Sequence, residues 1–106
     1  MAIEISWSAG SIDEARKVSR YLVQEGYVAC AQITPWIESI YTWNNQLETS
    51  QETKVIFKTE ERHLDKVKET IIKNTRYEIP EILWRRIEGG NESYLKWLEE
   101  ATSVKG

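Results

Sequence analysis

Residues 28–43 read VACAQITPWIESIYTW, and this stretch decides the fold of the chain. It ends in Tyr41-Thr42-Trp43, a strongly β-prone run. At about 3.3 Å per residue the whole stretch would extend on the order of 50 Å. Typical strands span only roughly 17–20 Å. Pro35 cannot donate to a ladder, so it marks a bulge, a break or an edge within an otherwise overlong strand.

A second strand is expected to return alongside the first. Asn44 and Asn45 supply the turn, because asparagine tolerates positive φ. Thr53–Thr59 then forms the returning strand, with Val55 and Phe57 on one face. The two segments together predict a long hairpin whose distal half overhangs a sheet of ordinary size. The alternative is that Pro35 folds the segment back into two short strands within one monomer.

Upstream of the hairpin the pattern predicts one strand and one helix. Ala2–Trp7 alternates apolar and polar residues, as a half-buried strand does. Ser11 and Glu14 match a capping box, which places a helix over residues 12–25. Gly26 is expected to end this helix, because glycine enters the left-handed region at low cost.

Downstream of the hairpin the pattern predicts a helix, a strand and a last helix. Thr59 is expected to cap the second helix, which stops near Asn74. A strand follows over 81–88, and Asn91 caps the final helix. The order strand–helix–strand–strand–helix–strand is the split βαβ arrangement. The expected fold is therefore α+β, a ferredoxin-like sandwich with a C-terminal helix, forming one domain over residues 1–106.

Composition narrows the classes of function. The formal net charge is −3 and the basic residues are scattered among acids, which argues against a nucleic-acid partner. The single cysteine, Cys30, excludes an intramolecular disulfide and fits a reducing compartment. We expect no signal peptide, because residues 1–11 have no basic region and no long apolar stretch. We also expect no membrane span, because no apolar run approaches the roughly 18 residues that a span requires. A cytoplasmic protein is the expectation.

The overhanging hairpin also predicts self-association. Trp36, Tyr41 and Trp43 lie in its distal half, and a long apolar edge in water invites pairing with another strand. A second copy of the chain is the simplest way to cover it.

Two residues are candidates for metal chemistry. Cys30 is either a buried hydrophobe or a soft ligand suited to Cu(I) or zinc. One thiolate cannot complete a tetrahedral site, although a homo-oligomer can pool ligands from several copies. His63, the only histidine, is expected to be an exposed helical residue.

The segment Tyr77-Glu78-Ile79-Pro80-Glu81 places two carboxylates and a phenol around a proline. Glu78 and Glu81 can bind a cation through oxygen or act as acid and base; a plain polar turn is the alternative. Lys58 can pair with one of these acids or remain a solvated strand-end lysine. No Cys-x-x-Cys, His-Glu-x-x-His, P-loop or Gly-x-Gly-x-x-Gly spacing is present, so we expect no enzyme.

Several ordered segments resemble the CutA divalent-cation-tolerance family. They match from about Ser11 to Glu100, and the ordered set is specific although each piece is weak alone. The matching segments are residues 28–33, 39–43, 56–59, 77–82, 90–91 and 94–97. Two positions depart from the family pattern. Thr75-Arg76 stands where the family has His-Pro before Tyr-Glu, and Asn45 stands where it has Gly.

The resemblance implies a ferredoxin-like homotrimer with a role in tolerance of divalent cations such as copper. PII-type signalling proteins have a similar trimer architecture and bind small effectors between subunits, which is the alternative function. We therefore expect a ligand cleft at a subunit boundary. Its predicted members are Cys30, Lys58, Tyr77, Glu78 and Glu81, with Trp43 supplied by a neighbouring subunit. Such a mixture suits an anionic ligand or a bridging metal, with Cys30, Glu78 and Glu81 as metal ligands.

Overall fold

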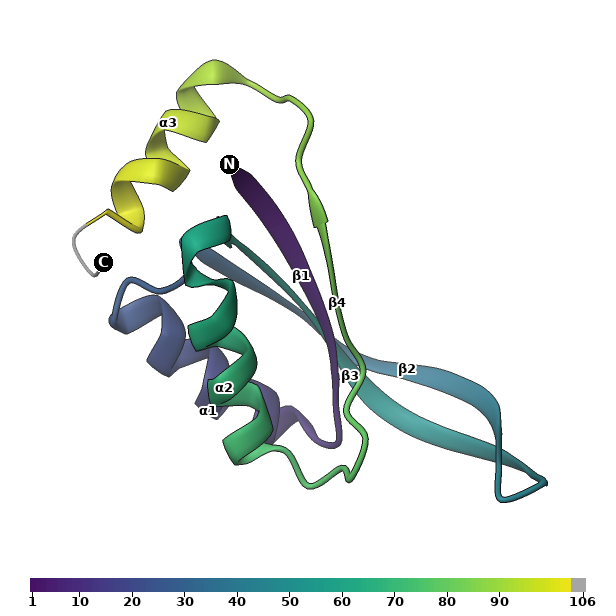
Figure 1. Cartoon of the computed structure of the whole chain (residues 1–106). Helices are drawn as coiled ribbons and strands as arrows, with labels where there is room; N and C mark the ends of the chain where they lie inside the picture. The colour runs from purple at the N-terminus through teal and green to yellow at the C-terminus, as the bar shows by residue number, and fades with distance from the viewer. Residues whose placement is uncertain (104–106) are drawn as a thin grey trace.

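Four antiparallel strands form the sheet in the computed structural model, which describes residues 1–103 (Figure 1). The strands are β1 (Ala2–Ala9), β2 (Cys30–Trp43), β3 (Gln46–Glu60) and β4 (Ile82–Arg86). Their order across the sheet is β2-β3-β1-β4, so the first and third strands lie at the centre. This is the order of the split βαβ fold, and the α+β, ferredoxin-like expectation is confirmed.

Three helices cover one face of this sheet and leave the other face open (Figure 1). They are α1 (Ile12–Gln24), α2 (Leu64–Asn74) and α3 (Glu92–Ala101). A 3₁₀ turn, Glu61–His63, precedes α2. None of the helices in residues 1–103 is long and apolar enough to cross a membrane.

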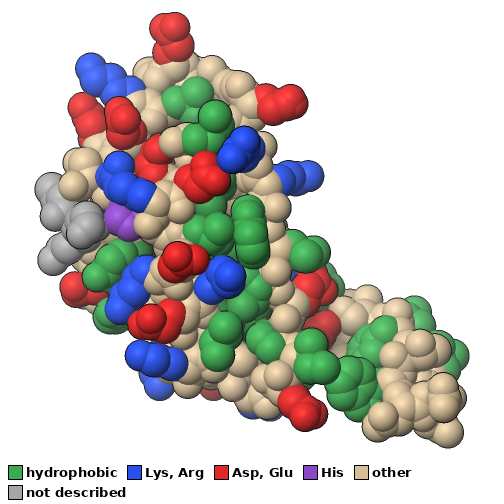
Figure 2. All heavy atoms as spheres, in the orientation of Figure 1, with side chains coloured by type: hydrophobic (Ala, Val, Ile, Leu, Met, Phe, Trp, Pro, Cys, Tyr) green, Lys and Arg blue, Asp and Glu red, His purple; other side chains and the backbone are tan. Residues whose placement is uncertain are grey.

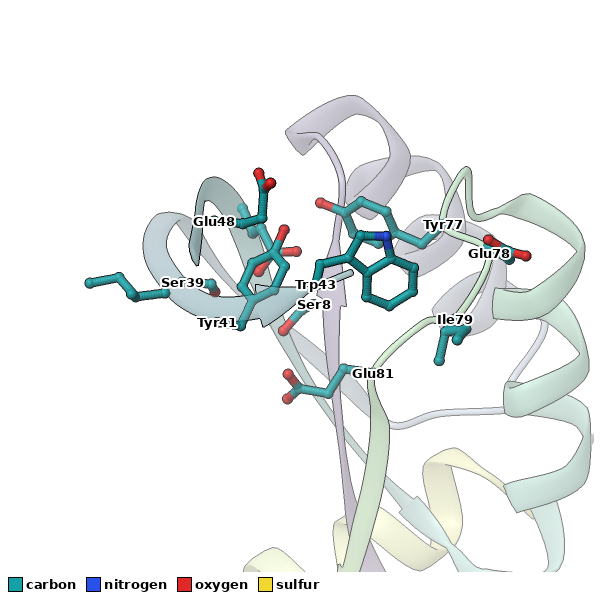
Figure 3. Close-up of a pocket in the computed structure, with 11 residues that line it drawn as sticks. Ser8, Ser39, Tyr41, Trp43, Glu48, Tyr77, Glu78, Ile79 and Glu81 are labelled. Atoms are coloured by element: carbon teal, nitrogen blue, oxygen red, sulfur yellow. The ribbon is translucent and has the colours of Figure 1, made fainter. Parts of the chain in front are cut away.

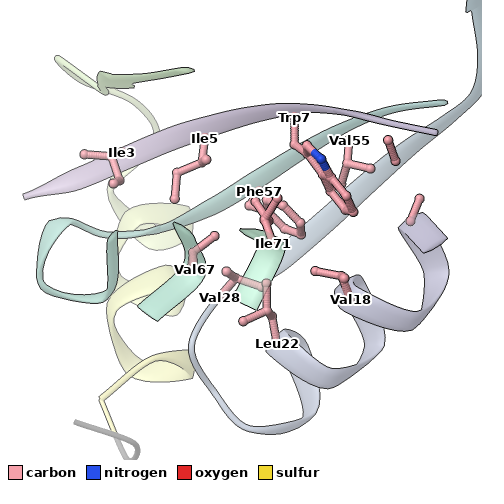
Figure 4. Close-up of a cluster of buried hydrophobic side chains, with 12 residues drawn as sticks. Ile3, Ile5, Trp7, Val18, Leu22, Val28, Val55, Phe57, Val67 and Ile71 are labelled. Carbon is pink, nitrogen blue, oxygen red and sulfur yellow. The ribbon is translucent and has the colours of Figure 1, made fainter. Parts of the chain in front are cut away.

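The core lies between the helices and the covered face of the sheet (Figure 4). Alternate residues of β1 and β3 point into it, as the period of two requires. The Trp7 ring stacks on Phe57 with centroids 6.2 Å apart and the ring planes 15° from parallel. The helices contribute buried apolar residues at helical spacing. These are Ala15, Val18 and Leu22 from α1, and Val67 and Ile71 from α2.

The predicted cap and end of α1 and the predicted cap of α3 are confirmed. The Ser11 hydroxyl accepts from the Glu14 N–H at 3.1 Å, and Gly26 takes a φ of 76° just after α1. The Asn91 side chain caps α3 by accepting from the Ser93 N–H.

The expected start of the second helix is wrong. Thr59 does not cap it, because this residue lies inside β3 and donates its hydroxyl to the Tyr27 carbonyl at 2.6 Å. The strand continues to Glu60, and the 3₁₀ turn separates it from α2. A hydroxyl that already bonds across to a neighbouring segment is not available to cap a helix.

His63 is also placed wrongly by the sequence pattern. Its side chain is only 3% exposed. The Nε2 atom lies 2.9 Å from the Thr102 carbonyl oxygen, and the ring meets Tyr27 edge-on with centroids 5.7 Å apart. Arg62 donates to the same carbonyl. Because the last carbonyls of a helix lack partners within it, the end of α3 uses these two side chains as donors.

The hairpin is one continuous pair of strands that projects beyond the sheet (Figure 1). Its tip turns at Asn44 and Asn45, with φ of 52° and 63°, as a type I′ turn requires. The register shifts between Thr34 and Ile37, so Pro35 marks a bulge. The fold-back alternative is wrong, because β2 runs through the bulge without reversing. Residues 46–52 of β3 pair with β2 alone, since β1 begins to pair with β3 only at Thr53.

The Trp7–Phe57 stack should dominate the stability of the core. We expect Phe57→Ala to lower the free energy of unfolding by about 3–5 kcal/mol, because a buried aromatic leaves a cavity. Denaturant unfolding at fixed protein concentration measures the change. The control is Val23→Ala on the exposed side of α1, which should stay within about 0.5 kcal/mol. A loss under about 1 kcal/mol for Phe57→Ala would show that the stack contributes little.

Candidate functional site

A cleft of about 710 Å³ opens between the projecting hairpin and the loop that leads into β4 (Figure 3). Side chains from the two walls face the same space. The hairpin supplies Ser39, Ile40, Tyr41, Trp43, Glu48 and Glu52. Ser8 of β1 and the loop residues Tyr77, Glu78, Ile79 and Glu81 complete the lining.

The hairpin wall follows from the strand register. Residues that face each other across an antiparallel pair share one side of the ribbon. Tyr41 is opposite Glu48, and Ser39 is opposite Ser50. The Tyr41 hydroxyl lies 2.6 Å from the Ser50 hydroxyl, which fixes the tyrosine ring on its strand. The cleft side of the hairpin therefore alternates aromatic and acidic residues with short polar ones.

The loop wall is held in place by a three-way contact with the start of α1. The Glu14 carboxylate accepts from the Gly10 N–H at 3.0 Å and from the Arg76 N–H at 3.1 Å. The Arg76 guanidinium donates to the Gly10 carbonyl. A Cβ atom at Gly10 would overlap the Arg76 Nε. The loop is therefore positioned by one carboxylate, one guanidinium and the absence of a side chain at Gly10.

Tyr77 connects the two walls of the cleft. Its N–H donates to the Thr75 hydroxyl at 3.2 Å, which shapes the loop. Burial and a hydrogen bond to the Glu52 carboxylate, together with the negative charge of Glu52, raise the pKa of Tyr77 to about 12. Arg76, whose guanidinium lies 6.0 Å from the ring centroid, lowers this pKa but does not cancel the rise. The phenol therefore keeps its proton at physiological pH.

Glu81 sits at the entrance of β4 and carries the one ion pair of the cleft's described lining. Lys54 Nζ lies 2.8 Å from Glu81 Oε2 and also donates to the Ser8 hydroxyl at 3.3 Å. Within the described part of the chain, Glu48, Glu52 and Glu78 form no ion pair. The cleft lining is therefore acidic, with Lys54 paired to Glu81 and the Arg76 guanidinium beside Tyr77.

Four of the six predicted site residues line this cleft: Trp43, Tyr77, Glu78 and Glu81. Trp43 reaches it from the same chain, whereas a neighbouring subunit was expected to supply it. Trp43, next to the tip of the hairpin, lies beside Tyr77 of the loop in this cleft (Figure 3).

Cys30 and Lys58 are not among the cleft residues. They face each other across β2 and β3 on the open face of the sheet, where Lys58 Nζ donates to the Gln32 side chain at 2.8 Å. Lys58 lies four residues along β3 from Lys54, which corresponds to about 13 Å of strand. One chain therefore does not bring these two residues to Glu78 and Glu81, and Lys54 takes the place expected for Lys58. The lysine expected beside these acids is thus Lys54, which pairs with Glu81, and no lysine belongs to the described lining of the cleft.

Glu48, Glu52 and Lys54 were not predicted as site residues. Their signal was present in the period of two along β3, since all three have even numbers and point to one side of the strand. What the pattern could not supply was the bend of the hairpin that turns this side toward the 77–81 loop.

A single chain does not hold the predicted metal ligands together. Among residues 1–103, no three His, Cys, Asp or Glu side chains lie close enough to hold a metal ion. Cys30 is half-buried on the open sheet face, away from the carboxylates of the cleft. Cys30, Glu78 and Glu81 thus do not fit a closed metal site within one subunit.

The raised pKa of Tyr77 gives a testable signature. In a spectrophotometric titration of the tyrosines, we expect one group with a midpoint near 12, which Tyr77→Phe removes. Glu52→Gln should lower that midpoint, because it removes the negative charge next to the phenol. The native pKa lies above the ordinary value of about 10, so the associated stabilisation is complete below pH 10 and is lost as the pH rises toward 12. A Tyr77 midpoint near 10 would contradict the hydrogen bond to Glu52. Circular dichroism at each pH checks that the fold persists.

Comparison with known proteins gives one consistent result. The Divalent-cation tolerance protein CutA of Thermus thermophilus is 37% identical over 92 residues, which cover 87% of this chain and 89% of that protein. Protein CutA 1, chloroplastic, of Oryza sativa is 36% identical over 90 residues. The match covers 85% of this chain but only 51% of the rice protein, so the chain spans about half the length of that relative.

The solved structures agree with the sequence comparison. The structure of the divalent cation tolerance protein (Cut A1) from Thermus thermophilus has a TM-score of 0.91 at 34% identity, covering 96% of this chain and 99% of that one. The family model described as CutA1 divalent ion tolerance protein matches residues 3–101. With nearly the whole chain matched in sequence and in fold, this protein belongs to the CutA1 divalent ion tolerance family.

Proposed function

We propose that this chain works as a cytoplasmic homotrimer in divalent-cation tolerance, binding or responding to metal ions such as copper. The observation that carries the proposal is the acidic cleft between the 77–81 loop and a hairpin that overhangs its own sheet. The overhang supports self-association, and the carboxylates of the cleft support an interaction with cations. We assign no catalytic role to the cleft residues.

Self-association is supported by the side of the hairpin that faces away from the cleft. Figure 2 shows hydrophobic side chains at the surface of the projecting hairpin and in a band that runs from it toward α3. On the hairpin, Trp36 and Leu47, which do not line the cleft, are 59% and 74% exposed. Both edges of the sheet, β2 and β4, also have unpaired backbone in a single copy. An exposed apolar strand next to an open edge is stabilised when another copy pairs with it.

The cation role is supported by the charge of the cleft. Glu48, Glu52, Glu78 and Glu81 surround it, and carboxylate oxygens are suitable ligands for divalent cations. Because one chain does not cluster three donors within residues 1–103, a metal site needs donors from neighbouring copies. Cys30 remains a candidate in that arrangement, since it lies on the open face of the sheet, which a second copy can approach.

A PII-like signalling or scaffold trimer is the second candidate function. The size of the cleft favours it, because about 710 Å³ is room for a small organic molecule. Trp43 and Tyr77 offer ring surfaces, while Glu78 and Glu81 offer polar contacts. Lys58, on the open sheet face, would contribute only from another copy.

Assembly can be tested by light scattering. At micromolar concentration we expect a mass of about three times the 12.4 kDa of one chain. Leu47→Glu should lower the mass, because it places a charge in the apolar surface of the hairpin. Val23→Glu, at an exposed apolar position on α1, is the matched control and should leave the mass unchanged. A monomeric wild-type chain would overturn the proposal.

Cation binding can be tested by titration calorimetry with Cu(II) and Zn(II). We expect saturable binding that weakens on the order of tenfold or more in Glu81→Gln and in Cys30→Ser, since even outer contacts of a metal site have effects of this size. Glu92→Gln on the exposed first turn of α3 is the control and should bind as the wild type does. Binding that is unaffected by Cys30→Ser, Glu78→Gln and Glu81→Gln would exclude these ligands.

A further inference from the structure

We propose that the cleft binds a small organic cation, a protonated amine or a quaternary ammonium ion, between aromatic rings and carboxylates. This inference rests on the proposed function in one respect, since both take this cleft as the ligand site. It differs in the ligand, which is an organic cation and not a metal ion, and in needing donors from one chain only.

Aromatic rings on both walls carry the inference. Tyr41 and Trp43 come from the hairpin, and Tyr77 comes from the loop (Figure 3). Trp43 is 45% exposed, although its ring belongs to a concave surface rather than to a flat one. The faces of tryptophan and tyrosine rings attract a cation within about 6 Å, and tryptophan does so best. Rings contributed by two elements around one space are suited to a cation with an apolar surface.

The charge of the cleft also favours a cationic ligand, and this argument does not depend on the aromatic rings. Four carboxylates line it, and none of its described lining residues is lysine or arginine. Lys54 compensates Glu81 alone, at 2.8 Å. Glu52 belongs to the lining and forms no ion pair within the described residues, so its negative charge stays within the cleft. The Arg76 guanidinium lies 6.0 Å from the Tyr77 ring centroid and offsets part of this charge, but four carboxylates in the lining still favour a cation over an anion.

The spacing of the donors separates an organic cation from a metal ion. A calcium or zinc ion needs several donors at about 2.0–2.6 Å from one point. No such group of three exists among residues 1–103, because the carboxylates are distributed around about 710 Å³ of space. An ammonium ion with alkyl groups spreads its charge over a larger radius. It can therefore contact rings and carboxylates that do not converge.

The test compares tetramethylammonium chloride with tert-butanol, a neutral molecule of similar size, by calorimetry at constant ionic strength. We expect saturable binding of tetramethylammonium to the wild-type protein, and binding of tert-butanol that is at least about tenfold weaker. Trp43→Leu should weaken tetramethylammonium binding on the order of tenfold. The matched control is Trp97→Leu, since Trp97 on α3 is 46% exposed and lies outside the cleft. It should bind as the wild type does.

Glu52→Gln provides a second variant that preserves shape and should also weaken binding of tetramethylammonium. Equal binding of the two probes, no saturable binding of tetramethylammonium, or unchanged binding in both cleft variants would overturn the inference. Titration with Cu(II) on the same samples separates it from the proposed function. If the protein binds Cu(II) but not tetramethylammonium, this inference is contradicted and the proposed metal role is not. If it binds tetramethylammonium but not Cu(II), only the proposed metal role is contradicted. Circular dichroism and light scattering establish that each variant keeps its fold and mass.

Discussion

The structure depends on a single strand that has two different environments along its length. The C-terminal half of β3 lies between β1 and β2 and carries Val55 and Phe57 into the core. Its N-terminal half pairs with β2 alone and carries Glu48 and Glu52 to the cleft. Because the strand is continuous, the core fixes the direction in which the hairpin leaves the sheet. The position of the cleft wall is thus set by packing at the other end of the same strand.

The opposite wall depends on a polar contact instead of on packing. Glu14 belongs to the cap of α1, yet its two carboxylate oxygens accept from Gly10 and from Arg76. The side chain that the capping box predicted therefore also connects the first helix to the loop before β4. Tyr77 of that loop lies close enough to Glu52 of β3 for the carboxylate to raise the pKa of the phenol. Hydrogen bonds thus join the start of α1 to the loop, and the charge of Glu52 acts on the loop from β3.

Most of the fold could be predicted from local patterns. Alternation in β1, the cap at Ser11, the left-handed Gly26 and the Asn44-Asn45 turn each specify their own geometry, and each is observed. Where the sequence misled, a distant partner decided the outcome. His63 is buried because the end of α3 needs donors, and Thr59 is occupied by the Tyr27 carbonyl. The site was predicted for the contiguous 77–81 segment and missed for Glu48 and Glu52, because the bend of the hairpin is not encoded in any short pattern.

The contact between Gly10 and Arg76 has a consequence for how this chain can change over generations. A side chain at position 10 would occupy the space of the Arg76 guanidinium. The structural effect of changing both positions therefore depends on which of them changes first. If the arginine is replaced first by a short residue, the overlap between its guanidinium and a Cβ at position 10 is removed in advance. If the glycine is replaced first, the guanidinium must move from its place on the Gly10 carbonyl, and only the N–H bonds to Glu14 still hold the loop. The two positions are 66 residues apart in sequence but in direct contact. They therefore form an epistatic pair: the effect of a substitution at one position depends on which residue already stands at the other.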